Sequence, residues 1–182
     1  MTNRITPALI TPALITSSQT IGPFPHEGWR WAAELSQQGA TATTWITIGG
    51  VLFDGQGQPV SDGWVEAWSP VAAAGEQERP MPGFRRCATG ERGEFRIELG
   101  ASPQAAPGEP VAWITLFARG LLKHQFCAVF LADAPGLANS ELLAQVPEAR
   151  RDTLIAQRQA DGSYRWDIHL QGERETVFLD FE

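Results

Sequence analysis

The distribution of apolar and polar side chains predicts a protein built mostly from β-strands. Apolar residues alternate with polar ones at 94–99 and again at 164–170. Such a period of two is typical of strands that bury one face and expose the other. The runs 111–118 and 125–131 are apolar on both sides, and we expect them to lie in the middle of a sheet. A last strand is predicted at 176–179.

Turn and loop signals separate these strands. The apolar run 45–53 leads into Asp54-Gly55-Gln56-Gly57, and Asp-Gly after such a run predicts a reversal of the chain. Segments 70–83 and 100–110 are rich in Pro, Ala and Gly and are predicted to be long loops. One helix is predicted, with Pro147 at its first position and continuing through 149–157. The pattern favours an all-β fold, a β-sandwich with a short helix and long loops.

The chain length is that of one domain, preceded by a short arm. The 182 residues are enough for a single hydrophobic core. A five-residue segment, Thr-Pro-Ala-Leu-Ile, is repeated directly at 6–10 and 11–15. This local duplication is not the long period of a solenoid protein. We therefore expect residues 1–17 to form a flexible N-terminal arm and residues 18–182 to form the domain.

Charge and cysteine content exclude several kinds of partner. The net charge is −7, and Lys123 is the only lysine, so the composition argues against a nucleic-acid partner. No run of about 18 apolar residues is present, which argues against a membrane span. The N-terminus matches a secretory signal weakly. Cys87 and Cys127 lack the spacing of a metal site or a dense disulfide framework, so we expect reduced thiols and a cytoplasmic protein. The alternative is a secreted fold with one disulfide bridge.

The side chains that usually carry catalysis or bind metals are scarce. The three histidines, His26, His124 and His169, lie in separate segments and form no His-x-His or His-x-x-x-His pair. Tyr164 is the only tyrosine. No Gly-x-Ser-x-Gly or phosphate-binding glycine motif is present. From its residues alone, the chain is predicted to have no catalytic group and no metal site of its own.

Two local features suggest binding. Residues 19–26 combine two prolines, a glycine, an aromatic residue and a histidine, which predicts a rigid turn that a ligand could approach closely. The alternative is a turn that only begins the domain. Arg119 follows an apolar strand beside Gly120, and an arginine there could hold a carboxylate through paired hydrogen bonds. The alternative for Arg119 is a structural ion pair.

These features and the C-terminal segment resemble a known family. The chain is similar to the alpha subunits of protocatechuate 3,4-dioxygenase, in the intradiol ring-cleavage dioxygenase family. The resemblance extends from about residue 18 to the C-terminus and rests on separated segments in the same order: 18–24, 116–120, 150–158, 164–168, 171–173 and 175–178. It implies an intradiol-dioxygenase-like β-sandwich, in agreement with the strand pattern.

The resemblance also implies an activity that needs a second chain. In this family a homologous beta subunit holds Fe(III) with two tyrosines and two histidines, and the alpha subunit lacks these ligands. The assembled enzyme, a higher oligomer of alpha–beta units, cleaves protocatechuate with O2 between its two hydroxyls to 3-carboxy-cis,cis-muconate. In this chain Val111-Ala112-Trp113 stands where the beta chain has His-x-His, and one tyrosine cannot supply two tyrosinate ligands.

The resemblance assigns this chain a share of the substrate pocket. Thr20, Gly22, Pro23 and Phe24 fall on the family's N-terminal turn, which lines the cleft between alpha and beta subunits. Arg119 falls on the family's pocket arginine, where it would attract the anionic substrate.

A second hypothesis is a non-catalytic β-sandwich module that binds carbohydrate or protein through surface tryptophans. Exposure separates the two hypotheses, because four tryptophans occupy strand positions where we expect burial: Trp64, Trp68, Trp113 and Trp166.

Overall fold

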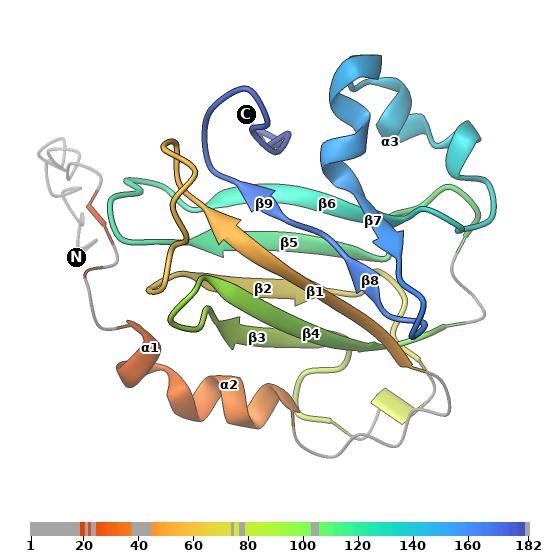
Figure 1. The fold of residues 1–182 in the computed structure, drawn as a ribbon. Helices are drawn as coiled ribbons and strands as arrows, with labels where there is room; N and C mark the ends of the chain where they lie inside the picture. The colour runs from red at the N-terminus through yellow and green to blue at the C-terminus, as the bar shows by residue number, and fades with distance from the viewer. Residues whose placement is uncertain are drawn as a thin grey trace, which may run out of the picture.

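The computed structural model describes residues 19–20, 22, 25–37, 45–73, 75–76, 79–102 and 106–180. The predicted arm, residues 1–17, lies outside these ranges, so its boundary stays a prediction. Figure 1 shows strands stacked in two layers, with α1 and α2 beside β3 and β4 and with α3 at the opposite side of the sheets. None of the helices in the described ranges is long and apolar enough to cross a membrane.

Strands make up most of the regular structure, and the helices are short. The helices are α1 (Pro25–Gly28), α2 (Arg30–Gln37) and α3 (Glu141–Ala144), with short 3-10 helices η2 (Leu137–Asn139) and η3 (Glu148–Leu154). The strands are β1 (Trp45–Phe53), β2 (Trp64–Trp68), β3 (Phe84–Ala88), β4 (Glu94–Gly100), β5 (Ala112–Phe117), β6 (Gln125–Leu131), β7 (Ile155–Arg158), β8 (Tyr164–Arg165) and β9 (Ile168–His169).

The strands form a sheet that folds over on itself. Its order is β3-β2-β5-β6-β7-β8-β1-β4, with β9 paired to β1. Strands β3, β2, β5 and β6 pair antiparallel and make one layer, β1 and β4 pair antiparallel in the other, and β7 and β8 connect the two layers. The two end strands of the sheet, β3 and β4, lie close together. Arg85 Nε on β3 donates a 2.7 Å hydrogen bond to the Glu98 carbonyl on β4. The all-β sandwich predicted from the sequence is therefore confirmed.

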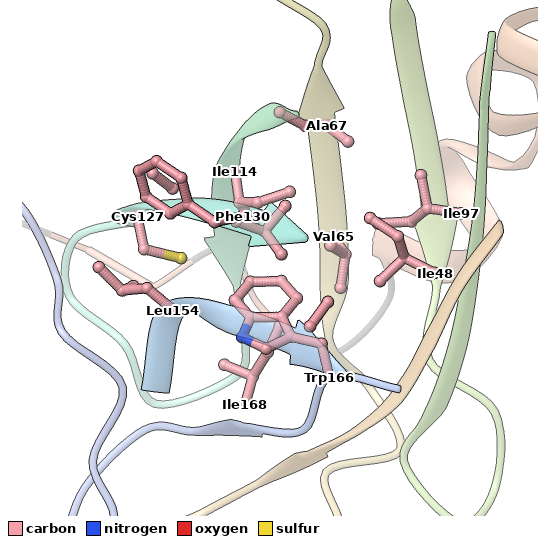
Figure 2. Packing of buried hydrophobic residues seen from close by; sticks show 14 of the residues in the cluster. Ile48, Val65, Ala67, Ile97, Ile114, Cys127, Phe130, Leu154, Trp166 and Ile168 are labelled. Atoms are coloured by element: carbon pink, nitrogen blue, oxygen red, sulfur yellow. The ribbon is translucent and has the colours of Figure 1, made fainter. Parts of the chain in front are cut away.

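Apolar side chains from both layers fill the space between them. Ile48 and Ile97 come from β1 and β4, while Val65, Ile114 and Phe130 come from the facing layer, and all five are buried. Figure 2 shows these side chains gathered between the strands. Burial of this kind is the main favourable contribution to folding, and it explains why alternate residues of β4 and β5 are apolar.

The predicted turn after β1 is confirmed. The Asp54 carboxylate accepts hydrogen bonds from the backbone N–H groups of Gln56 and Gln58, both at 2.8 Å, and Phe53 pairs with Pro59 across the turn. The runs 111–118 and 125–131 contain β5 and β6, which are inner strands as expected.

Three secondary-structure predictions are wrong in part. The helix predicted through 157 is a 3-10 helix ending at Leu154, because Ile155 and Ala156 pair instead with the end of β6. The strand predicted at 164–170 is two short pieces, since the Asp167 carboxylate, rather than a backbone carbonyl, accepts the Val51 N–H at 2.9 Å.

The third concerns residues 176–179, where only Leu179 pairs with a strand, through its bridge to Phe126. The α2 helix was not predicted from the sequence.

The prediction that four tryptophans are buried holds for only two of them. Trp64 and Trp166 are buried, Trp113 is partly buried and Trp68 is 41% exposed. Core side chains of β2 and β5, such as Val65 and Ile114, point inward, so Trp64, Trp68 and Trp113 at the alternate positions point outward. Trp64 is nevertheless buried, and the ring of Trp29 packs against it with centroids 6.1 Å apart.

The outer faces of the two layers differ in composition. On β4 the outward side chains are charged, and together with Thr47 of β1 we call this surface the polar face: Thr47, Glu94, Arg96 and Glu98. The other outward positions of β1 are not polar, and they include Trp45, which is 38% exposed. On β2, β3, β5 and β6 the outward positions include six aromatic residues, and we call this surface the aromatic face: Trp64, Trp68, Phe84, Trp113, Phe117 and Phe126.

Candidate functional site

Arg119 lies in the loop that connects β5 to β6, two residues after the last residue of β5. Its Nε lies 3.0 Å from Asp62 Oδ2, and its side chain is 66% exposed. The structural ion pair that the sequence analysis gave as the alternative for Arg119 is therefore present. It engages the Nε side of the guanidinium, whose two Nη groups carry four further donors. An arginine held in this way can be positioned by one carboxylate and still bind another.

The N-terminal turn is described at Thr20 and Gly22. Gly22 has φ +78°, a backbone conformation that favours glycine, and its N–H donates a 3.3 Å hydrogen bond to Thr20 Oγ1. A Cβ added at Gly22 would meet nothing within 4 Å. Glycine is therefore required at this position by the backbone angle rather than by contacts within this chain. Pro23 and Phe24 lie outside the described residues.

Trp29 connects the turn to the strand that carries Arg119. The residue follows α1, seven positions after Gly22, and its ring centroid lies 6.1 Å from that of Trp64. The same ring contacts Phe117 edge-on at 6.2 Å. Because Phe117 ends β5, two residues before Arg119, this packing holds the segment after the turn against the end of the strand that leads to Arg119.

His124 belongs to the same end of the molecule, and the sequence did not indicate this. Its ring lies 5.5 Å from Phe117 and 4.5 Å edge-on from Phe126. Arg119, Lys123 and His124 are all exposed. The pairing of Leu116 with Gln125 places these residues around one hairpin loop. The three residues lie within six consecutive positions of the sequence, and the register of β5 and β6 shows that they share one hairpin loop.

The donor groups described in the structure do not suit an iron site. No three His, Cys, Asp or Glu side chains gather closely enough to hold a metal ion in the parts of the chain that the structure describes. Tyr164 donates a 2.8 Å hydrogen bond to Asp133, and burial and this bond both raise the pKa of its phenol. It therefore remains protonated rather than becoming a tyrosinate.

The two cysteine thiols are also protonated at neutral pH. Both are free, and burial raises the pKa of Cys87 to about 12 and that of Cys127 further still. A thiol must lose its proton before it can bind a metal or act as a nucleophile. Neither cysteine is poised for such chemistry.

The fold is that of the intradiol ring-cleavage dioxygenases. The chain superposes on the dioxygenase domain of a carbohydrate-binding fusion protein from Streptomyces sp. SirexAA-E with a TM-score of 0.53 and 15% identity, over 74% of this chain and 83% of that one. For hydroxyquinol 1,2-dioxygenase from Pseudomonas putida DLL-E4 the TM-score is 0.52 and the identity 16%, over 94% of this chain and 68% of that one.

Comparison with individual protein sequences identifies the family within this fold. No family model matches the chain. The protocatechuate 3,4-dioxygenase alpha chain of Pseudomonas putida is 34% identical over 197 residues, covering 91% of this chain and 96% of its own. The alpha chain from Burkholderia cepacia is 34% identical over 151 residues, covering 74% and 76%. The chain belongs to the family of protocatechuate 3,4-dioxygenase alpha chains.

Proposed function

We propose that this chain is the alpha subunit of a protocatechuate 3,4-dioxygenase and that it works with an iron-bearing beta chain. The assembled enzyme would cleave protocatechuate with O2 between the two hydroxyls to 3-carboxy-cis,cis-muconate. The observation that carries this proposal is 34% identity over nearly the full length of a named alpha chain. A cytoplasmic location and assembly of several alpha–beta units form part of the same proposal.

The iron would be held by the beta chain, where it would activate the bound substrate toward O2. The unsuitable donor set in the described parts of this chain supports that division of roles. Arg119 would provide a positive charge for the substrate carboxylate, and its exposure supports contact with a molecule outside this chain. The N-terminal turn, with Thr20, Gly22, Pro23 and Phe24, would close the other side of the pocket. The packing of Trp29 on Phe117 supports placing the turn near Arg119.

The exposure of Trp68 supports a second property, recognition of another molecule through tryptophan. Exposed tryptophan is also the feature expected of a non-catalytic binding module. An alpha subunit also needs a binding surface, since it must recognise its partner chain. The two functions therefore share this feature, and the family relationship favours the subunit.

Iron content and turnover test the proposal as a whole. The chain expressed alone is expected to hold no stoichiometric iron and to have no activity, whereas co-expression with the beta chain is expected to yield an iron-containing, active complex. Tight stoichiometric iron in the lone chain, or no activity in the complex, would contradict the proposed function.

The role of Arg119 is tested by Arg119→Ala in the complex. Loss of one charged hydrogen-bond partner is expected to lower kcat/KM for protocatechuate by roughly 10-fold or more. Catechol, which lacks the carboxylate, should be turned over at an unchanged rate. Arg96→Ala is the matched control, because Arg96 is also 66% exposed and pairs with Glu98 at 2.9 Å. Equal kinetics for the two variants would reject the pocket role of Arg119.

A further inference from the structure

The aromatic face has a composition that solvent exposure does not explain. In a two-layer sandwich the outer side of an antiparallel sheet is normally polar, as it is on β4. On the other layer Trp68 is 41% exposed and stacks obliquely on Phe84 at 4.5 Å. Trp64 and Phe84 are themselves buried, while Trp113, Phe117 and Phe126 are half-buried, so Trp68 is the exposed member of a partly exposed aromatic surface. Such a surface is typical of a binding site.

Two grooves extend this surface. One, of about 350 Å³, is lined by Trp68, Trp113, Thr115 and Phe126. The other, of about 240 Å³, lies where α2 meets β3 and is lined by residues that include Trp31, Met81 and Phe84. Trp31 is 65% exposed and Met81 is 41% exposed. Tryptophan and methionine are enriched at the centres of protein interfaces.

Charged groups within the face are paired with each other. Glu66 and Arg86 lie on adjacent strands in its middle, and Arg86 Nε donates a 2.7 Å hydrogen bond to the Glu66 carboxylate. A partner that covers this pair meets charges that already neutralise one another. The cost of removing water from an unpaired charge is therefore avoided.

The aromatic face continues to the loop that carries Arg119. His124 packs on both Phe117 and Phe126, and it shares this loop with Arg119. Under the proposed function, Arg119 reaches into the pocket of the beta chain. A beta chain positioned against Arg119 therefore also lies next to the aromatic face. For this reason the beta chain is the molecule expected to cover that face.

We propose that the aromatic face, together with Trp31 and Met81, is the surface on which this subunit binds its iron-bearing partner chain. This inference rests on the proposed function. The exposed tryptophans form the central contacts, and the loop with Arg119 lies at the end of the interface nearest the substrate.

The test measures dissociation of the co-expressed complex on dilution, followed by light scattering. Trp68→Ser and Trp31→Ser are each expected to raise the dissociation constant at least about 30-fold, the size of a typical interface hot spot. Arg96→Ser on the polar face is the matched control and should change it less than about 3-fold, as expected for a residue outside the interface. Circular dichroism establishes that each variant is folded. Because Trp31 is more exposed than Trp68, the Trp31 variant still tests the interface if the Trp68 variant misfolds.

The outcomes separate this inference from the proposed function. An active complex that dissociates equally in both tryptophan variants and the wild type would overturn the assignment of the face and leave the function intact. Failure of the wild-type chain to bind the beta chain would overturn both. Self-association of the lone chain that Trp68→Ser abolishes, without an effect on the alpha–beta complex, would assign the face to a second copy and overturn the proposal.

Discussion

The polar face and the aromatic face occupy equivalent positions on the two layers of one sandwich, yet they differ in chemistry. On β4 the outward residues Glu94, Arg96 and Glu98 are charged and exposed. On β2 the outward residues Trp64 and Trp68 are aromatic. Both strands bury alternate apolar side chains in the same core. Equal periodicity therefore gives equal folding roles to the inner positions, while the outer positions are free to differ in function.

Ion pairs on the polar face and in the interior of the sandwich differ in burial. Arg96 and Glu98 form their ion pair in solvent. On the inward side of β3, opposite to Phe84 and Arg86, Arg85 forms an ion pair with Glu76, which is 1% exposed, and bonds across to β4. Burial is the largest single influence and raises the pKa of Glu76, but the hydrogen bonds from Arg85 and the Gly83 N–H, with the charges of Arg85 and Arg79, together outweigh it and the pKa is lowered. The buried pair helps to hold the two ends of the sheet together, whereas the exposed pair lies on the surface.

The largest expected effect divides the aromatic face into a structural part and a binding part. Trp64→Ala is expected to lower the free energy of unfolding by about 3–5 kcal/mol, because Trp64 is 1% exposed and its removal leaves a cavity. Trp31→Ala, at an exposed position, should cost less than about 0.5 kcal/mol. Denaturation with guanidinium measures both. If both variants lose a similar amount of unfolding free energy, the face does not divide into a structural part and a binding part.

A smaller effect concerns the aromatic pair at the edge of the polar face. His169 on β9 stacks on Phe53 at 4.8 Å, and burial, together with the charge of Arg174, lowers its pKa below the usual 6.5, while Asp167 acts in the opposite direction. The unfolded chain therefore takes up the proton first on acidification. The contribution of His169 is fully present above about pH 6.5 and is lost as the pH falls toward its folded pKa.

This pH dependence has a direct test. His169→Phe keeps an aromatic ring on Phe53, and the decline in unfolding free energy between about pH 7.5 and 5.5 should become shallower than in the wild type. The wild type, measured in parallel in the same buffers, is the reference. An unchanged slope in the His169 variant would show that its protonation does not affect folding.

The smallest effect is expected for the exposed ion pair of the polar face. Arg96→Ala, Glu98→Ala and the double variant form a mutant cycle, and their coupling energy should be less than about 0.5 kcal/mol, since both side chains are more than half exposed. Thermal and chemical unfolding measure it. A coupling above about 1 kcal/mol would mean that the polar face contributes more to stability than its exposure implies.

Much of the fold could be predicted because alternation is a local property. Strand β4 and the inner strands β5 and β6 follow directly from their apolar positions. The errors occurred where pairing with distant segments decided the conformation. Ile155 leaves the predicted helix to pair with Phe130, and Asp167 interrupts a strand because its carboxylate binds Val51.

The candidate site was predictable only in part. Arg119 and Gly22 were found from motifs that match a family. His124 could not be found in this way, because its position beside Phe117 depends on the register of two strands. Pairing of Arg119 with Asp62 joins residues more than fifty positions apart, and no local pattern predicts it.

The sequence by itself determined the set of strands, the side chains of the core and the shortage of metal-binding donors, since one tyrosine and three separated histidines are properties of the list of residues. Tertiary structure alone decided which outward tryptophans are exposed and which aromatic rings pack around His124. The reason is physical. Periodicity says which side of a strand faces the core, whereas what covers the other side depends on strand pairing and on helices distant in the chain.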